Sequence, residues 1–255
     1  TVKKAYIEDE NKNKIIDIKN NFLHVLNYSS KINKFITKKE LFKNLYFIKN
    51  MPKAIPYVTS YYFKKWGFCI KYDDLKKFQT KKYKVFIDSK FSKKKIPYAE
   101  YFIKGKSKKE FIFSTYICHP NLANDNFSGI IINALIADYL KKRKKLNYSY
   151  RVIFIPETIG SINYISERFN YLKKNTLAGY VLSCLGHGKK INVITKYDHY
   201  FSFKIVKRLF EKAKYSFQVK KWKERGSDER QFSSPNVNLP FTLVTKDKFM
   251  EYKNY

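Results

Sequence analysis

The stretch FIFSTYICHPNLANDNFSG, residues 111–129, decides our interpretation of the fold. It begins with a continuous apolar run, which is typical of a strand buried on both faces of a sheet. The run ends at His119, and Asp125 follows six residues later in a polar cluster. Ser128 and Gly129 then open a second apolar segment with helical spacing. A buried strand therefore delivers a histidine and an aspartate to its carboxyl end.

The same alternation of strands and helices continues towards residue 255. Apolar runs predict strands at 150–157, 177–186, 192–196, 215–222 and 239–246. Segments with helical spacing predict helices at 128–145, 161–174 and 197–214. Such alternation favours an α/β sheet layered between helices. Ligands of these sheets bind beyond the carboxyl ends of the strands, where His119, Glu157 and the pair Ser183–Cys184 are expected.

Residues 1–104 have a different pattern, with short alternating segments broken by turns. Residues 3–18 and 22–30 predict strands, and residues 82–91 with 99–105 predict a hairpin. Residues 37–48 predict a short helix capped by Thr37. We therefore predict a β-rich domain at 1–104 and an α/β domain at 105–255.

The residues at the predicted strand ends favour metal chemistry. Histidine nitrogen and carboxylate oxygen are good Zn²⁺ ligands, which makes His119 and Asp125 candidates. Asp125 precedes a helix, where a carboxylate is stabilised. Glu157 ends the next strand at the same edge, and a carboxylate facing a metal-bound water can act as general base. Taken singly, His119 also fits a structural histidine, and Glu157 a solvated strand end.

Composition sets expectations for compartment and partners. The formal net charge is +32, from 53 Lys and Arg against 21 Asp and Glu. Because the lysines are scattered through every segment, we interpret the charge as compositional and expect no nucleic-acid partner. Three widely spaced cysteines without a CxxC pair favour a reducing cytoplasm. No apolar run reaches the roughly 18 residues of a membrane-spanning helix, so we expect no membrane partner.

Four longer strings carry a resemblance to a known family: AIPYVTSYYFKKWGFC, STYICHPNLANDNFSG, IPETIGSINYI and GSDERQFSSPNVNLP. The chain resembles the bacterial polysaccharide biosynthesis proteins with an aminopeptidase-like domain, within the zinc aminopeptidase superfamily. The resemblance implies a three-layer α/β/α sandwich of the zinc-exopeptidase type with a smaller β-rich domain inserted into it. It also implies an earlier piece of the sandwich and a C-terminal winged-helix domain, both outside residues 1–255.

The resemblance also implies roles for individual residues. His119 matches a histidine that binds one metal, Asp125 matches an aspartate that bridges two metals, and Glu157 matches the general base. The next position in the family is a second metal-binding glutamate, but here it is Thr158. A later aspartate at a strand end is also missing, and Ser183, Cys184 or His187 are the alternatives for its replacement. A final histidine ligand is expected beyond Tyr255.

These departures predict a single Zn²⁺ ion rather than two. The expected function is a zinc-dependent aminopeptidase-like hydrolase of amide bonds, acting on a small peptide or an acylated amino sugar in polysaccharide biosynthesis. A catalytically inactive aminopeptidase-like binding module is the alternative. The segment GSDERQF is expected to form a loop near the pocket, in which Asp228, Glu229 and Arg230 either bind substrate or form a solvated cluster. Homo-oligomerisation stays open.

Overall fold

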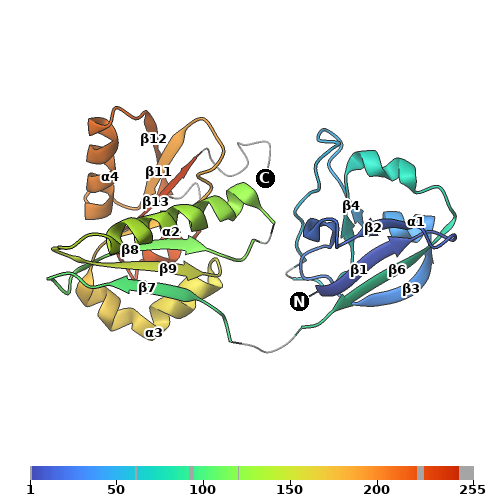
Figure 1. The fold of residues 1–255 in the computed structure, drawn as a ribbon, viewed down its shortest axis with the longest axis horizontal. Helices are drawn as coiled ribbons and strands as arrows, with labels where there is room; N and C mark the ends of the chain where they lie inside the picture. Colours follow the sequence, from blue (N-terminus) through green and yellow to red (C-terminus); the bar gives the residue numbers. More distant parts are fainter. Residues whose placement is uncertain (1, 61, 92–94, 120, 223–226, 247–255) are drawn as a thin grey trace. The chain divides into compact units, whose positions relative to one another are not determined.

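The computed structural model describes residues 1–255 except 1, 61, 92–94, 120, 223–226 and 247–255. The chain divides into two compact units, Thr1–Lys94 and Lys95–Lys253. Each unit is built around its own sheet (Figure 1). We describe the units one at a time.

The first unit is built on a four-stranded antiparallel sheet in the order β2-β1-β6-β3. Alternate side chains such as Ala5, Ile7, Val85 and Ile87 point into its core, as the period of two along a strand requires. The strands span Val2–Glu8 (β1), Lys14–Asp17 (β2), Ile32–Thr37 (β3) and Lys82–Ser89 (β6).

Short elements complete the first unit, and two of them differ from the prediction. The helix capped by Thr37, whose hydroxyl accepts the backbone N–H of Glu40 at 3.2 Å, ends at Phe42 and not near residue 48. Residues 22–30 do not form the predicted strand, because their first residues close a single 3₁₀ turn. The elements are η1 (Phe22–His24), α1 (Lys38–Phe42), β4 (Leu45–Tyr46), β5 (Phe68–Cys69) and η2 (Tyr72–Lys77).

The second unit contains a mixed sheet of seven strands in the order β12-β11-β13-β10-β8-β9-β7. The central strands β13, β10, β8 and β9 are parallel, and β7 is antiparallel to β9. The pair β11 and β12 runs antiparallel to β13. The strands span Ala99–Ile103 (β7), Glu110–Tyr116 (β8), Ser149–Ile155 (β9), Thr176–Leu182 (β10), Ile191–Thr195 (β11), Phe217–Lys221 (β12) and Phe241–Lys246 (β13).

Helices cover both faces of this sheet, which confirms the predicted α/β sandwich. One buried cluster joins the sheet to α3 and α5, through residues such as Ile165 and Phe232. The other joins its opposite face to α4 and α2, through residues such as Phe203 and Ile132. The helices are α2 (Ser128–Lys141), α3 (Ile159–Asn175), α4 (Phe201–Lys212) and α5 (Asp228–Phe232). None of the described helices is both long and apolar enough to cross a membrane.

The predicted hairpin between residues 82–91 and 99–105 is wrong. β6 pairs with β1 and β3 in the first unit, whereas β7 pairs with β9 in the second. Both segments alternate like strands, and alternation alone does not identify the partner strand. The two units therefore divide between Lys94 and Lys95, ten residues before the boundary that the sequence pattern suggested.

Candidate metal centre

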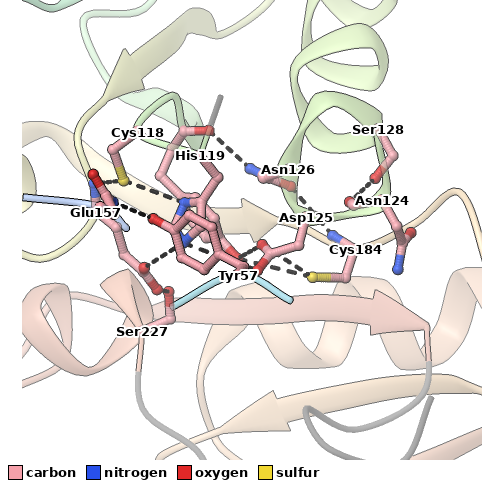
Figure 2. A network of polar contacts seen from close by, with 12 residues as sticks. Tyr57, Cys118, His119, Asn124, Asp125, Asn126, Ser128, Glu157, Cys184 and Ser227 are labelled. Carbon is pink, nitrogen blue, oxygen red and sulfur yellow. Dashed lines mark hydrogen bonds and ion pairs between the residues drawn. The ribbon is translucent and has the colours of Figure 1, made fainter. Parts of the chain in front are cut away.

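The parallel strands β8 and β9 bring His119 and Glu157 to one edge of the sheet. Tyr116 and Ile155 are directly paired at the ends of these strands, and the two site residues follow just beyond them. His119 Nε2 lies 3.7 Å from Glu157 Oε2 and 4.0 Å from Asp125 Oδ2. Figure 2 shows the three side chains converging. All three residues that the sequence indicated therefore meet in space.

Asp125 is held in a buried turn between β8 and α2. The turn spans Ala123–Phe127 (η3), and Asp125 is 4% exposed. Tyr116 Oη donates a hydrogen bond to Asp125 Oδ1 at 2.6 Å, and Cys184 Sγ contacts the same oxygen at 3.4 Å. The peptide bond from Asp125 to Asn126 is cis. One carboxylate oxygen thus faces Tyr116 and Cys184, while the other faces His119.

Polar side chains of the same turn fix the backbone that follows β10. Asn126 Oδ1 accepts the backbone N–H of Cys184 at 3.2 Å, and Ser128 Oγ accepts that of Leu185 at 2.9 Å. Asn124 Oδ1 accepts two more, from Gly186 and His187. Sequence reasoning missed these contacts, because their partners lie about sixty positions apart and no local pattern reports them.

A strained turn at Thr158, just before α3, positions Glu157. Thr158 has a φ of 60° and a ψ of −67°, and the backbone N–H of Ile159 donates to Glu157 O at 2.7 Å. This is a three-residue γ-turn, a conformation that is rare and costly for a β-branched residue. Ser227 Oγ donates to Glu157 Oε1 at 2.7 Å, which restricts the orientation of the carboxylate.

The predicted loop at residues 226–232 is instead a helix from residue 228, since α5 spans Asp228–Phe232. Asp228 and Glu229 are fully buried, so they do not form a solvated cluster; Arg230 is exposed and stacks over Trp222 at 5.4 Å. Asp228 Oδ1 accepts the backbone N–H of Thr158 at 2.8 Å and the hydroxyl of Ser161 at 2.9 Å. The pKa of Asp228 is raised to about 7, mainly by burial and in part by the charge of Glu157, while the bonds from Thr158 and Ser161 oppose the shift.

Cys118 is the neighbour of His119 on the side away from Asp125. Its Sγ lies 3.3 Å from His119 Nδ1 and accepts the backbone N–H of Glu157 at 3.2 Å. Burial raises the pKa of its thiol to about 12. In the tautomer with the proton on Nδ1, His119 donates to this sulfur, and its Nε2 lone pair points towards the carboxylates. Metal-binding histidines commonly use their second nitrogen in this way.

Two sets of side chains in this cluster fit a metal ion. Cys118, His119 and Glu157 offer ligand atoms that all lie within 4.8 Å of one another. The second set uses His119 Nε2 with Asp125. We favour the second set, because two carboxylates face Nε2 whereas Nδ1 is engaged by the sulfur. Zinc ligands in a tetrahedral site are about 3.3–3.6 Å apart, so a small inward shift of these side chains would suit a bound ion.

The charge of the cluster supports the same fit. Asp125, Glu157 and Asp228 are bonded, within the described ranges, to hydroxyls, thiol and backbone N–H groups rather than to lysine or arginine. This concentration of carboxylates occurs in a chain with a net charge of +32. Buried carboxylates near one another are costly unless a cation or a proton compensates them. The donor set is therefore suited to a cation.

Comparisons with known proteins identify the family to which the chain belongs. A family model described as a domain of unknown function (DUF4910) matches residues 27–255. A Clostridium acetobutylicum protein, provisionally named as a polysaccharide biosynthesis protein with an aminopeptidase-like domain, is 40% identical over 94% of this chain and 55% of its own length. A crystal structure from Clostridium acetobutylicum, provisionally named as a peptidase, is 37% identical with a TM-score of 0.94, covering 99% of this chain and 60% of that one.

A zinc aminopeptidase from Bacillus subtilis shares the fold alone. It is 14% identical with a TM-score of 0.66, covering 96% of this chain and 71% of that one. The chain spans somewhat more than half the length of its two Clostridium relatives. The resemblance that the sequence motifs indicated is thereby confirmed. The chain belongs to the DUF4910 family, is homologous to the aminopeptidase-like proteins linked to polysaccharide biosynthesis, and has the fold of the zinc aminopeptidases.

Proposed function

We propose that this chain carries most of a mononuclear zinc site that hydrolyses amide bonds. His119 and Asp125 are the metal ligands, and Glu157 is the general base. The observation that supports this most strongly is the position of His119 Nε2, with Glu157 Oε2 at 3.7 Å and Asp125 Oδ2 at 4.0 Å. A further histidine ligand from beyond Tyr255 belongs to the proposal.

The two carboxylates have different surroundings, which suits them to different roles. The Asp125 side chain is 5% exposed, and Oδ1 is taken up by Tyr116 and Cys184. The Glu157 side chain is 27% exposed, and only Oε1 receives the hydroxyl of Ser227. These surroundings support the role of Asp125 as a fixed ligand, and the contact of Glu157 with solvent supports its role in taking a proton from a water molecule.

A bound zinc ion would acidify that water and polarise the substrate carbonyl. Glu157 would hold the proton at Oε2 and then pass it to the leaving amine. Ser227 would keep the carboxylate in the orientation required for both transfers. Thr158 occupies the position directly after Glu157 and is a poor metal ligand, which supports one metal ion rather than two.

For the substrate, we propose a small molecule with an amide bond, either a peptide amino terminus or an acylated amino sugar. The name of the Clostridium acetobutylicum relative, which links it to polysaccharide biosynthesis, supports the amino sugar. Both substrates present the same carbonyl chemistry to the site.

The test is metal content followed by activity, on the full-length protein. Elemental analysis should find about one zinc ion per chain, and the His119→Ala variant should lose it. Glu157→Gln should keep the metal but reduce hydrolysis by about 10²–10⁴-fold, because the base is lost and the ligands remain. Absence of stoichiometric zinc after zinc is supplied would refute the proposal and favour an inactive binding module.

A further inference from the structure

The first unit has a hollow at one end of its sheet, with a volume of about 340 Å³. It lies where β1 begins and β6 ends, since Val2 and Ser89, which are paired at those ends, both line it. The start of η1 and residues 27–29 and 90–91 complete the described part of its wall, and all of them belong to the first unit. Its volume falls within the range of about 300–1,000 Å³ that is typical of small-molecule sites.

Three exposed aromatic side chains line the hollow. Phe22 is 42% exposed, Tyr28 46% and Phe91 64%, so each ring offers a large apolar surface to solvent. Phe22 and Tyr28 precede β3, whereas Phe91 follows β6, so the fold rather than a local run of sequence brings the rings to one wall. Exposed apolar groups that gather in this way are typical of binding sites.

The backbone of Tyr28 is held in a strained conformation. Its φ is 63°, in the left-handed region that bulky residues rarely adopt. Asn27 Oδ1 accepts the backbone N–H of Tyr28 at 3.1 Å, and Asn27 Nδ2 donates to Tyr57 Oη at 2.7 Å. Such a conformation persists only where the surroundings impose it, and it is frequent at ligand sites. The strained turn thus presents an exposed ring at a set position in the wall.

The polar groups of the wall suit a ligand that carries hydroxyl and amide groups. Ser89 Oγ is buried and has no hydrogen-bond partner among the described residues. Because a buried hydroxyl without a partner is costly, a ligand group that bonds to it would remove that cost. Among the described lining residues, Lys90 is the single one with a cationic side chain. A phosphate-rich ligand such as a nucleic acid strand is usually held by several cationic groups.

We propose that this hollow binds one ring of a carbohydrate chain that contains acylated amino sugars. The C–H face of a pyranose ring stacks on aromatic rings, whose negative faces attract polarised C–H bonds. A hydroxyl or acylamino group of the sugar gives Ser89 Oγ the partner that it lacks among the described residues. The Clostridium acetobutylicum relative, whose name links it to polysaccharide biosynthesis, supports a carbohydrate ligand. The choice of an acylated amino sugar rests on the proposed function, whereas the site itself does not.

The test uses the full-length protein, triacetylchitotriose as the probe, and saturation-transfer NMR. Irradiating the aromatic protons of the protein should transfer saturation to the C–H protons of the sugar, because the rings are in contact. Tyr28→Ala and Phe91→Ala should each weaken binding by about 10-fold, whereas Phe91→Tyr, which keeps a ring, should bind like the wild type. Phe35→Ala is the matched control, since it removes a ring that is 65% exposed on β3, outside the hollow.

The outcomes separate this site from the proposed metal centre. No saturation transfer to the sugar, or an unchanged affinity in both Tyr28→Ala and Phe91→Ala, would overturn the carbohydrate site. Equal affinity for maltotriose would overturn the choice of an acylated amino sugar. Binding of an oligothymidylate that the same two variants weaken would assign the hollow to single-stranded nucleic acid instead. His119→Ala should bind the sugar like the wild type, so a protein without zinc that keeps this binding refutes the hydrolase alone.

Discussion

The same two strands, β8 and β9, carry a buried charged cluster at each end, and the two clusters differ in their balance of charge. Near one end, Arg151 donates to Glu110 Oε1 at 3.0 Å and to Oε2 at 2.9 Å, and it also contacts Glu100. The Tyr171 hydroxyl donates a hydrogen bond to Glu110 Oε2 at 3.0 Å. At the other end the side chains of His119, Asp125 and Glu157 meet, and the described hydrogen bonds to the two carboxylates come from hydroxyl and thiol groups.

The comparison separates buried charges that are balanced within the fold from carboxylates that are not. The Arg151 cluster contains its own counter-charges, so it is complete as it stands. The His119 cluster has an excess of carboxylates, which favours uptake of a cation or of protons. Removing a charge should therefore have opposite consequences at the two ends.

Arg151→Met should have the largest effect on stability. It leaves Glu110, which is fully buried, without its cation, and breaking a buried pair in this way costs about 3–5 kcal/mol. Urea unfolding of the full-length protein measures the loss. The double variant Arg151→Met with Glu110→Gln should recover much of it; equal destabilisation of single and double variants would contradict a structural ion pair.

The pH dependence of stability should report the charge excess at the other end. The pKa of Asp228 is raised from 3.8 to about 7 in the folded protein, so folding favours its protonated form. Its contribution to the free energy of unfolding, on the order of 4 kcal/mol, is complete below about pH 4 and is lost as the pH rises through about 7. Asp228→Asn, which keeps an oxygen for Thr158, should flatten unfolding free energy over this range. An unchanged slope would show that Asp228 is ionised in the fold.

Zinc should stabilise the wild-type protein by about 2.7 kcal/mol when its free concentration is 100 times the dissociation constant. Asp125→Asn should abolish this gain with little loss of stability in metal-free buffer, because an oxygen remains for Tyr116. Thermal unfolding with and without zinc measures both quantities. A large metal-free loss in Asp125→Asn would make the carboxylate a structural group like Glu110.

Thr158→Gly should have the smallest effect, and it should be favourable. Glycine adopts the positive φ of 60° without the strain that threonine has there, so the free energy of unfolding should rise by about 1 kcal/mol. Ser166→Gly, at an exposed position within α3, is the control and should lose about 0.5 kcal/mol. If both variants are destabilised equally in urea, the turn at Thr158 stores no strain.

The sequence predicted the strands and helices of the second unit better than those of the first. Strands buried on both faces, such as Glu110–Tyr116, leave continuous apolar runs that are easy to identify. In the first unit, residues 22–30 alternate in hydrophobicity yet form a 3₁₀ turn and isolated bridges. There a single local pattern is compatible with several structures, and tertiary contacts decide among them.

For the candidate site, strand ends identified His119, Asp125 and Glu157, whereas the residues that orient them had no sequence signal. Ser227 and Asp228 reach Glu157 and Thr158 from seventy positions away. The contact of Cys184 with Asp125 also depends on the parallel pairing of β8 and β10, which no local pattern specifies. Sequence motifs identified the candidate site residues, whereas the residues that orient them are brought close only by the topology of the sheet.

The bonds between the η3 turn and residues 184–187 also tie the site to the order in which the chain folds. They join segments separated by 57–63 positions, which the parallel pairing of β8 and β10 brings together. Contacts of such high sequence separation are acquired late and slowly in folding. A chain in which these strands are not yet paired would thus lack the proposed metal site. Under that proposal, only chains with a complete central sheet would bind the metal ion.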